Sequence, residues 1–187
     1  IEDISIMRSL PNMKVLCPGD PIETNSLVKA SHANFGPMYI RLGKNGEQCI
    51  NKYDAKIILG KASIISEGKD SALITTSTML QIGKQWIDEW KEEGFDVSLI
   101  SMHTIKPLDK GIIEKLITEE IPIITLEEHN IIGGLGSAVA EVIADRGKAV
   151  KFKRIAIPDK YSHYVGNQEF QRQKFDLLKK PDLNYIK

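Results

Sequence analysis

Two cations, Arg41 and Lys44, flank the carboxyl end of a predicted strand at residues 38–42 and could bind an anion. Open α/β sheets bind their ligands beyond the carboxyl ends of the strands, which is where these two side chains stand. Because Gly43 and Gly46 leave the backbone open around them, a phosphate group fits the pattern. A solvated polar turn would contain the same residues, so the residues alone leave both interpretations open.

A glycine-rich segment, Gly133-Gly134-Leu135-Gly136, precedes a predicted helix. Free amides and the dipole at a helix N-terminus favour an anion there, so a dinucleotide site is one interpretation. That site requires glycines directly after a strand and an acidic residue closing the next strand. Here the glycines begin seven residues beyond Leu126, and no acidic residue closes the strand at 150–157. The pattern therefore favours close packing of a helix on a sheet.

Glu127, Glu128 and His129 are consecutive groups that could transfer protons. Adjacent strand residues point to opposite faces, so only Glu127 and His129 would share a face. We expect them to cap a loop or form a subunit contact. His103 and His163 are isolated, and no residue has a metal-binding partner at the usual spacings. We therefore predict no metal ligand in this sequence.

The composition excludes several classes of partner. Lys plus Arg and Asp plus Glu each total 25, which gives a formal charge of zero and no basic footprint for nucleic acid or an anionic membrane. No apolar run approaches the ~20 residues that span a bilayer. Cys17 and Cys49 stand apart and are expected to be free thiols, so we predict a cytoplasmic protein. No phosphate loop ending in Gly-Lys-Ser/Thr and no Gly-x-Ser-x-Gly elbow occurs.

Strand-like and helix-like patterns alternate along the chain, which indicates an α/β fold with a mostly parallel sheet. Apolar runs such as residues 121–126 predict strands covered on both faces, hence a three-layer α/β/α domain. Asp20 with Glu23 predicts a helix start, and Thr78 predicts another. Residues 106–109 are expected to form a loop. The predicted strands are 13–17, 38–42, 62–66, 71–76, 97–102, 121–126 and 150–157, and the predicted helices are 4–10, 21–34, 79–93, 112–117, 134–146 and 168–178.

A change of character after residue 43 predicts two parts joined by a linker. We expect an incomplete α/β segment at residues 1–50, a linker at 51–60 and a C-terminal domain at 61–187. The first part has too few elements to bury a core alone, so other chain or a partner must complete it. The missing initiator Met agrees with a start inside a longer coding sequence.

Several long segments resemble transketolases in family order. Ile1-Glu2-Asp3-Ile4 and residues 7–13 resemble the pyrimidine-binding domain just after its His-Gln segment, and 17–23 and 36–42 continue the match. In the second part the similar segments are 102–109, 127–130 with 133–138, and 154–159.

This resemblance implies thiamine diphosphate and Mg²⁺ chemistry, in which a two-carbon ketol unit is transferred between sugar phosphates. The family binds this cofactor between the pyrophosphate domain of one subunit and the pyrimidine domain of another, where a glutamate assists deprotonation. This sequence contains no Gly-Asp-Gly and starts after the place of that glutamate. From this departure we expect no cofactor on this chain alone, no catalytic residue in it and no turnover by it. The implied partners are the pyrophosphate-binding half of the enzyme and a second copy in a homodimer.

The resemblance aligns Lys44 with the arginine that contacts the sugar phosphate in transketolases and deoxyxylulose-phosphate synthases. It aligns Arg41 with the earlier arginine of the Arg-x-x-Arg pattern that is typical of the synthases. Lysine keeps the charge but lacks the bidentate fork of arginine. Residues 102–105 and Glu128-His129 favour transketolase, whereas Arg41 with Lys44 favours a deoxyxylulose-phosphate synthase. The same residues are also compatible with a 2-oxo acid dehydrogenase beta-type subunit or with a non-catalytic assembly module.

Overall fold

The computed structural model describes residues 1–184, which form a five-stranded sheet, a smaller three-stranded sheet and six helices within that range. The large sheet has the strand order β3-β5-β4-β7-β8, in which β4, β5, β7 and β8 run parallel and β3 is an antiparallel edge. This confirms the predicted α/β class with a mostly parallel sheet. The helices are α1 (Asp3–Ser9), α2 (Pro21–Ala33), α3 (Met79–Glu92), α4 (Lys110–Thr118), α5 (Leu135–Arg146) and α6 (Gln168–Lys174), and the strands are β1 (Lys14–Leu16), β2 (Met38–Ile40), β3 (Ser63–Ser66), β4 (Ser71–Thr75), β5 (Val97–Ser101), β6 (Thr104–Lys106), β7 (Ile123–Asn130) and β8 (Phe152–Ile157).

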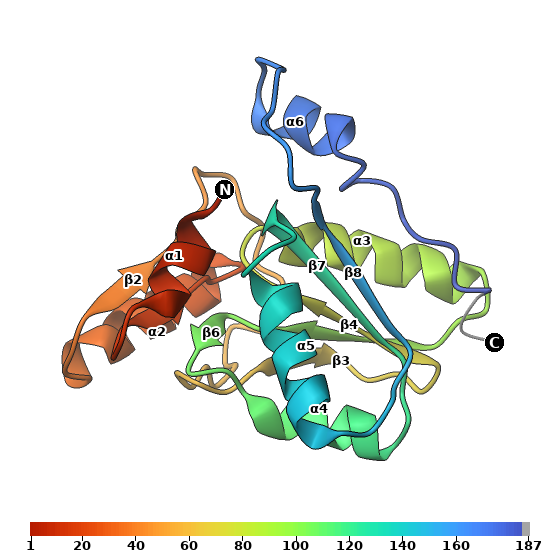
Figure 1. Ribbon diagram of the computed structural model, residues 1–187, viewed down its shortest axis with the longest axis horizontal. Coiled ribbons are helices and arrows are strands. Elements are labelled where there is room, and N and C mark those ends of the chain that lie inside the picture. The colour runs from red at the N-terminus through yellow and green to blue at the C-terminus, as the bar shows by residue number, and fades with distance from the viewer. Residues whose placement is uncertain (185–187) are drawn as a thin grey trace.

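Helices cover both faces of the large sheet, as three layers require. In Figure 1, α3 lies on one face, and α4 and α5 lie on the other. Two apolar clusters fill the spaces between these layers, one containing Trp86 and Trp90 of α3 and one containing Val139 and Val142 of α5. Apolar residues at spacings of three and four bury one side of α3, which is the helical periodicity of its sequence.

The first part of the chain packs against the side of the large sheet (Figure 1). Its three-stranded sheet has the order β2-β1-β6, so the third strand comes from residues 104–106 of the second part. Ile4, Val15 and Cys17 lie in the same apolar cluster as the residues of α4 and α5. The two parts therefore share one core.

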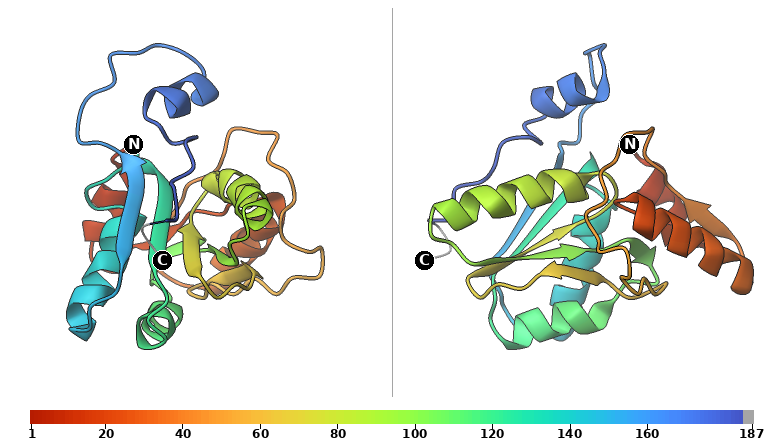
Figure 2. Two further views of the ribbon diagram at one scale, coloured as in Figure 1. Left: turned by 90° about the vertical axis from the view of Figure 1, so that its right-hand side faces the viewer. Right: turned by 180° about the vertical axis from the view of Figure 1, so that it is seen from behind.

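A projecting segment, residues 158–176, is called the arm below. It leaves β8, contains α6, and stands away from the large sheet in both views of Figure 2. The chain then returns along α3, where Trp90 Nε1 donates a hydrogen bond to the Pro181 carbonyl at 3.3 Å. Within residues 1–184 no helix combines the length and apolarity that crossing a bilayer requires.

Four local expectations differ from the structure. The expected loop at 106–109 begins with the end of β6, and β7 continues past residue 126 to Asn130. The last helix ends at Lys174 rather than at residue 178. Thr78 precedes α3 but makes no side-chain cap there, because its backbone is helical and its hydroxyl is engaged elsewhere.

Candidate functional site

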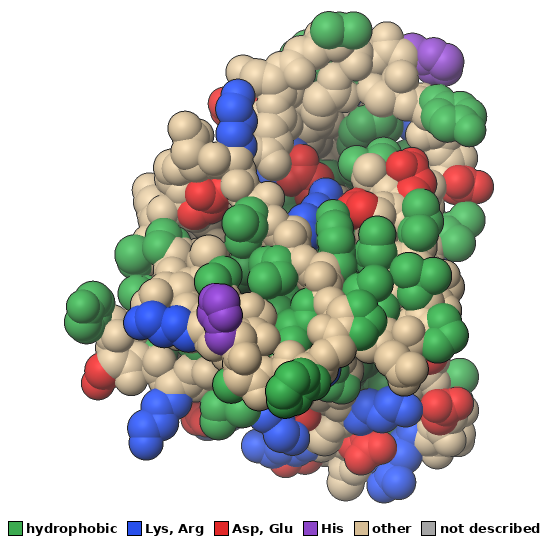
Figure 3. Space-filling view, turned by 90° about the vertical axis from the view of Figure 1, so that its left-hand side faces the viewer, with side chains coloured by type: hydrophobic (Ala, Val, Ile, Leu, Met, Phe, Trp, Pro, Cys, Tyr) green, Lys and Arg blue, Asp and Glu red, His purple; other side chains and the backbone are tan. Residues whose placement is uncertain are grey.

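A cavity of about 560 Å³ lies at the carboxyl ends of β4, β7 and β8. One side is formed by residues that follow β2 and β4, and the other by the arm, which Figure 3 shows arching over a hollow that contains acidic and basic side chains. Both predicted phosphate-binding residues, Arg41 and Lys44, line this cavity. The cavity therefore occupies the position that open α/β sheets use for ligands. Its other lining residues include Leu42, Ser77, Thr78, Glu128, Tyr164 and Gln171.

Arg41 is held by one group from β7 and one from α1. Its Nη1 donates to the Glu128 carbonyl at 3.0 Å, and its Nε lies 3.4 Å from Asp3 Oδ2. Tyr39 donates its hydroxyl to the same Asp3 carboxylate at 2.8 Å. Burial opposes ionisation of Asp3, but Arg41 and Tyr39 together lower its pKa below the ordinary value. Arg41 is thus a fixed cation whose charge Asp3 largely compensates.

Lys44 is exposed, and within residues 1–184 no hydrogen bond or ion pair engages its ammonium group. The loop that carries it is anchored at its far end by Asp20. Asp20 Oδ2 accepts from the backbone amides of Ile50 and Asn51 at 2.9 and 2.7 Å, while Asp20 Oδ1 caps α2 through the Glu23 amide at 2.8 Å. The predicted cap of α2 by Asp20 is confirmed. The same carboxylate also holds the end of the loop that carries Lys44, the cation of the cavity without a charged partner in the described range.

Glu23 does not complete the reciprocal capping contact with Asp20. It is fully buried, its Oε2 accepts from the Gly19 amide at 2.7 Å, and its Oε1 accepts from Asn51 Nδ2 at 3.1 Å. Burial raises the pKa of the Glu23 carboxyl to about 7, with Asp20 adding to the shift and the two hydrogen bonds opposing it. Glu23 and Asp20 therefore form a buried acidic pair that joins α2 to the loop end.

Glu128 and Arg172 connect the arm to the body of the molecule across the cavity. Arg172 donates from Nε and Nη2 to Glu128 Oε2 at 2.9 and 2.5 Å, and its Nη2 also donates to Thr78 Oγ1 at 2.6 Å. Gln168 Nε2 donates to the same carboxylate oxygen at 2.9 Å. We call these four side chains the clasp. Charge-assisted bonds to a guanidinium are among the stronger polar contacts in proteins.

The backbone amides at the glycine-rich turn donate to the side-chain carboxyl group of Glu127, which occupies the position that an external anion would take. The buried carboxylate accepts from the amides of Leu135 and Gly136 at 2.7 and 2.8 Å, at the N-terminus of α5. A side chain at Gly134 would place its Cβ 2.0 Å from Glu127 Oε2, so the glycine permits this approach. Burial raises the pKa of Glu127 to about 7, and the two amides oppose that shift. The expected close packing and capping are both observed.

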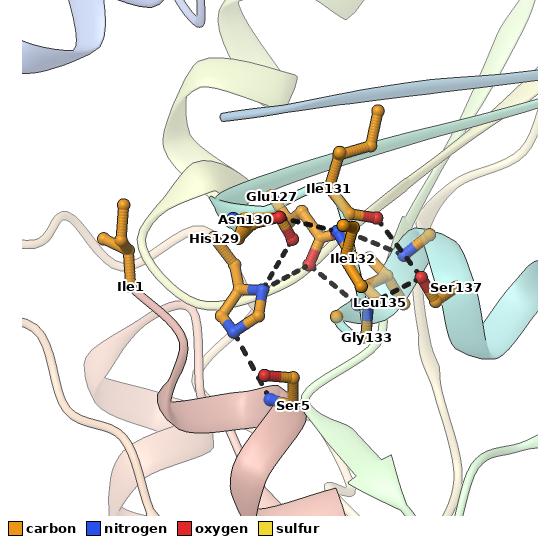
Figure 4. A network of polar contacts seen from close by, with 12 residues as sticks. Ile1, Ser5, Glu127, His129, Asn130, Ile131, Ile132, Gly133, Leu135 and Ser137 are labelled. Carbon is orange, nitrogen blue, oxygen red and sulfur yellow. Dashed lines mark hydrogen bonds and ion pairs between the residues drawn. The ribbon is translucent and has the colours of Figure 1, made fainter. Parts of the chain in front are cut away.

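His129 packs beside Glu127 and fixes α1 (Figure 4). Its Nδ1 lies 2.7 Å from the Asn130 carbonyl, and its Nε2 accepts from the Ser5 amide at 3.3 Å. This pairing requires the neutral ring with hydrogen on Nδ1, in agreement with a pKa that burial lowers. His129 therefore has a structural role at the junction between the two parts of the chain.

The described residues do not fit the diphosphate and Mg²⁺ that the family resemblance implies. In that range no group of His, Cys, Asp and Glu side chains has the geometry to hold a metal ion. The helix N-terminus that could receive a diphosphate is filled by Glu127. The described residues therefore offer no donor set that fits this cofactor.

A three-layer domain with a cavity at the carboxyl ends of its strands has the architecture of open α/β domains, a class that places its ligand sites at this edge of the sheet. Comparison with known sequences then identifies the family. Residues 60–176 match the sequence model described as "Transketolase, C-terminal domain", and the chain belongs to that family.

Individual relatives agree with this assignment. A Methanocaldococcus jannaschii protein named as a transketolase C-terminal section is 38% identical over 84% of this chain and 50% of its own length. The 1-deoxy-D-xylulose-5-phosphate synthase of Shouchella clausii is 33% identical over 91% of this chain and 28% of its own length. The chain thus spans half or less of these curated relatives.

A solved structure described as "Split gene transketolase, inactive beta4 tetramer" superposes with a TM-score of 0.85 and 30% identity. The match covers 95% of this chain and 56% of that one. It therefore includes the first part of the chain, which the family model leaves out, as well as the second.

The sequence predicts that Arg41 and Lys44 lie at a strand end, and both line the cavity there, but it does not predict the clasp or the anchoring role of Asp20. Position at the end of a strand is a local signal, and it places the two cations without settling what they bind. Arg172 and Glu128 are 44 positions apart, and no local pattern links them. The buried Asp20 was visible only as a helix cap, because its loop partners lie about thirty residues away.

Proposed function

We propose that this chain is the C-terminal part of a cytoplasmic, transketolase-like enzyme that transfers a two-carbon ketol unit between sugar phosphates. In this proposal residues 1–50 are the tail of the pyrimidine-binding domain, 51–60 a linker and 61–187 the C-terminal domain. The family assignment supports the reaction class, and the uncompensated Lys44 in a cavity of ligand size supports an anionic substrate. The cavity with Lys44 in its lining is the main structural observation that supports the proposal.

Lys44 and Arg41 are proposed to bind the substrate phosphate. Lys44 contributes an ammonium group without a protein partner in the described range, whereas Arg41 contributes a positive edge already shared with Asp3. A phosphate at Lys44 would form a charge-assisted hydrogen bond with the ammonium group, which contributes about 1.5–3 kcal/mol to the free energy of binding. The remaining polar groups of the cavity, such as Ser77 and Gln171, suit the hydroxyls of a sugar.

The proposed partners are the pyrophosphate-binding half of the same enzyme and a second copy of this chain. Thiamine diphosphate, when bound between the halves, supplies the carbanion that ketol transfer needs. The solved neighbour described as a split-gene transketolase and an inactive tetramer supports a separate subunit as that half. This chain's own contribution is then to bind and orient the phosphate end of the sugar.

Turnover measurements test this division of labour. The chain alone, with thiamine diphosphate, Mg²⁺, xylulose 5-phosphate and ribose 5-phosphate, should show no ketol transfer. Addition of the pyrophosphate-binding half encoded in the same genome should restore it. Ketol transfer by the chain alone would refute the proposal, and so would a reconstituted complex that binds the cofactor but transfers nothing.

Lys44→Ala tests the phosphate site in the reconstituted enzyme. Loss of one charge-assisted contact should raise the KM for phosphorylated sugars by about tenfold or more and leave kcat less affected. Lys56→Ala, an exposed lysine outside the cavity lining, is the matched control and should leave KM unchanged. An unchanged KM in Lys44→Ala would remove Lys44 from the site.

A deoxyxylulose-phosphate synthase is the second candidate, supported by the Shouchella clausii relative and by the spacing of Arg41 and Lys44. The reconstituted complex should be offered substrates of both reactions. Formation of 1-deoxy-D-xylulose 5-phosphate in place of a ketol-transfer product would select the synthase.

A further inference from the structure

The arm encloses the cavity but contacts the body of the molecule sparsely. Residues 158–170 are almost entirely exposed, with Tyr161 and Val165 87% and 98% accessible. Behind α6 the chain is firmly anchored, because Phe175 and Leu177 are buried against the α3 side of the sheet. The middle of the arm thus depends on polar contacts for its position.

Asn130 Nδ2 donates to Asp159 Oδ1 at 3.0 Å near the start of the arm, and the other polar contacts between the arm and the body converge on the clasp. The side chains of Arg172 and Glu128 are only 13% and 14% exposed, and the two hydrogen bonds from Arg172 to one carboxylate oxygen of Glu128 bring α6 onto the end of β7. Thr78 adds a contact to the start of α3. Arg172 itself does not line the cavity, whereas Glu128 and Gln168 do. Arg172 can therefore influence a ligand only by holding these neighbours in place.

The clasp is also linked to the cationic side of the cavity. Glu128 accepts from Arg41 through its backbone carbonyl and from Arg172 through its carboxylate. A single residue therefore ties the wall formed by the arm to the wall that carries Arg41. The two walls differ in chemistry, since the body contributes cations and the arm contributes neutral groups, among them Ser162, Tyr164 and Gln171.

We propose that the arm is the specificity wall of the cavity and that Arg172 is the positioning residue that holds it there. The phosphate of a ligand would lie at Lys44, and its polyhydroxylated carbon chain would lie against the neutral side chains of the arm. The identity of the ligand class rests on the proposed function. The inferred role of Arg172 rests on the contacts of the clasp and does not depend on the proposed function.

Two measurements on the full chain test this. Hydrogen exchange of the hydrogen-bonded amides of residues 170–175, in and just after α6, should be about tenfold faster in Arg172→Gln, because local opening of this helix depends on the lost contacts. Arg172→Lys keeps the charge without the fork and should give an intermediate rate. Arg146→Lys, an exposed arginine at the end of α5, is the control and should leave exchange unchanged.

The second measurement compares the binding of ribose 5-phosphate with that of inorganic phosphate by NMR titration. Arg172→Gln should weaken the sugar phosphate about tenfold relative to inorganic phosphate, which does not reach the arm. Lys44→Ala should weaken both probes, and failure of this result counts against the phosphate site and the proposed function.

The inference about the arm can be contradicted by results that leave the phosphate site and the proposed function intact. It is overturned if Arg172→Gln, still folded by circular dichroism, exchanges like the wild type or weakens both probes equally. A purely structural role for Arg172 would change the melting temperature without changing the ratio of the two affinities.

Discussion

At the residue scale, Glu127 organises the turn that joins β7 to α5. Its carboxylate satisfies two amides at the helix N-terminus, and all of its surroundings are buried. Removing such an acceptor leaves buried donors without partners, which costs more than the bond itself contributes.

Glu127→Gln should therefore lower the free energy of unfolding by about 1–3 kcal/mol, because the amide can accept through only one of its two terminal atoms. Glu141→Gln is the matched control. Its carboxylate is exposed and pairs with Arg8, so its loss should cost less than about 1 kcal/mol. Urea denaturation followed by circular dichroism measures both values, and equal losses would contradict this role for Glu127.

His103 should make stability fall as the solution is acidified. It is fully buried, and burial lowers its pKa from 6.5 to about 4, so the folded state stays neutral while the unfolded state takes up a proton. Stability is then complete above the unfolded pKa and is lost as pH falls from about 6.5 toward 4. Relative to His103→Gln, the wild type should lose about 2–3 kcal/mol between about pH 7.5 and 4.5. A difference that does not vary with pH would contradict this prediction.

Residue roles were predictable from sequence where the partner is close along the chain. Asp20 caps α2 through a contact three positions away, as its type and spacing indicate. The roles of Glu127 and Arg172 depend on which strands and helices lie side by side. A glutamate that follows an apolar run gives no sign that its carboxylate will be folded onto the amides of a helix beginning eight positions later.

At the element scale, α3 packs unusually close to the large sheet through Gly83. A Cβ at this position would lie 2.7 Å from Thr75 Cγ2 and 3.1 Å from Leu99 Cδ1. The glycine lies inside a helix, where it costs roughly 1 kcal/mol relative to alanine. The close approach to β4 and β5 explains why a residue with poor helix propensity occupies this place.

Gly83→Ala should destabilise the chain by about 1–3 kcal/mol through overpacking, in spite of the better helix propensity of alanine. Gly111→Ala in α4 is the natural comparison, since its nearest neighbour would be Asp109 Oδ1 at 3.4 Å. That variant should be neutral or slightly stabilised. Thermal melts of the two proteins should move in different directions, and a stabilised Gly83→Ala would show that the helix can shift outward freely.

Element types followed from periodicity, whereas strand partners did not. The helical spacing in α3 and the apolar run in β7 identify both elements directly. The three-residue β6 has no periodic signal, and its assignment to another sheet is a tertiary effect. Similarly, β3 pairs antiparallel with β5 and not with the next strand along the chain, β4, because the crossover through α3 places β5 between them.

At the scale of the whole molecule, the two parts behave structurally as one unit. Lys106 donates to the carbonyls of Arg8 and Leu10 at 2.8 and 2.7 Å, and Arg8 donates to the Gly133 carbonyl at 2.7 Å. Together with the shared apolar cluster, these contacts couple the opening of one part to the exposure of the other.

We therefore expect a single cooperative unfolding transition for the full chain. A fragment of residues 60–187 should be less stable, because Ile105 and Leu135, both buried in the shared cluster, would lose neighbours from the first part. Differential scanning calorimetry distinguishes the cases. Two resolved transitions, or a fragment as stable as the parent, would contradict the shared core.

The strand β6 has a consequence for modular exchange of these proteins. It follows its neighbour β1 by about ninety residues along the chain. A chimera of two homologous proteins that is joined between these strands would therefore pair β1 from one parent with β6 from the other. Only junctions placed before β1 or after β6 take all three strands of the small sheet from the same parent protein. Recombination, natural or engineered, should therefore tolerate junctions outside this interval and penalise those at the apparent linker.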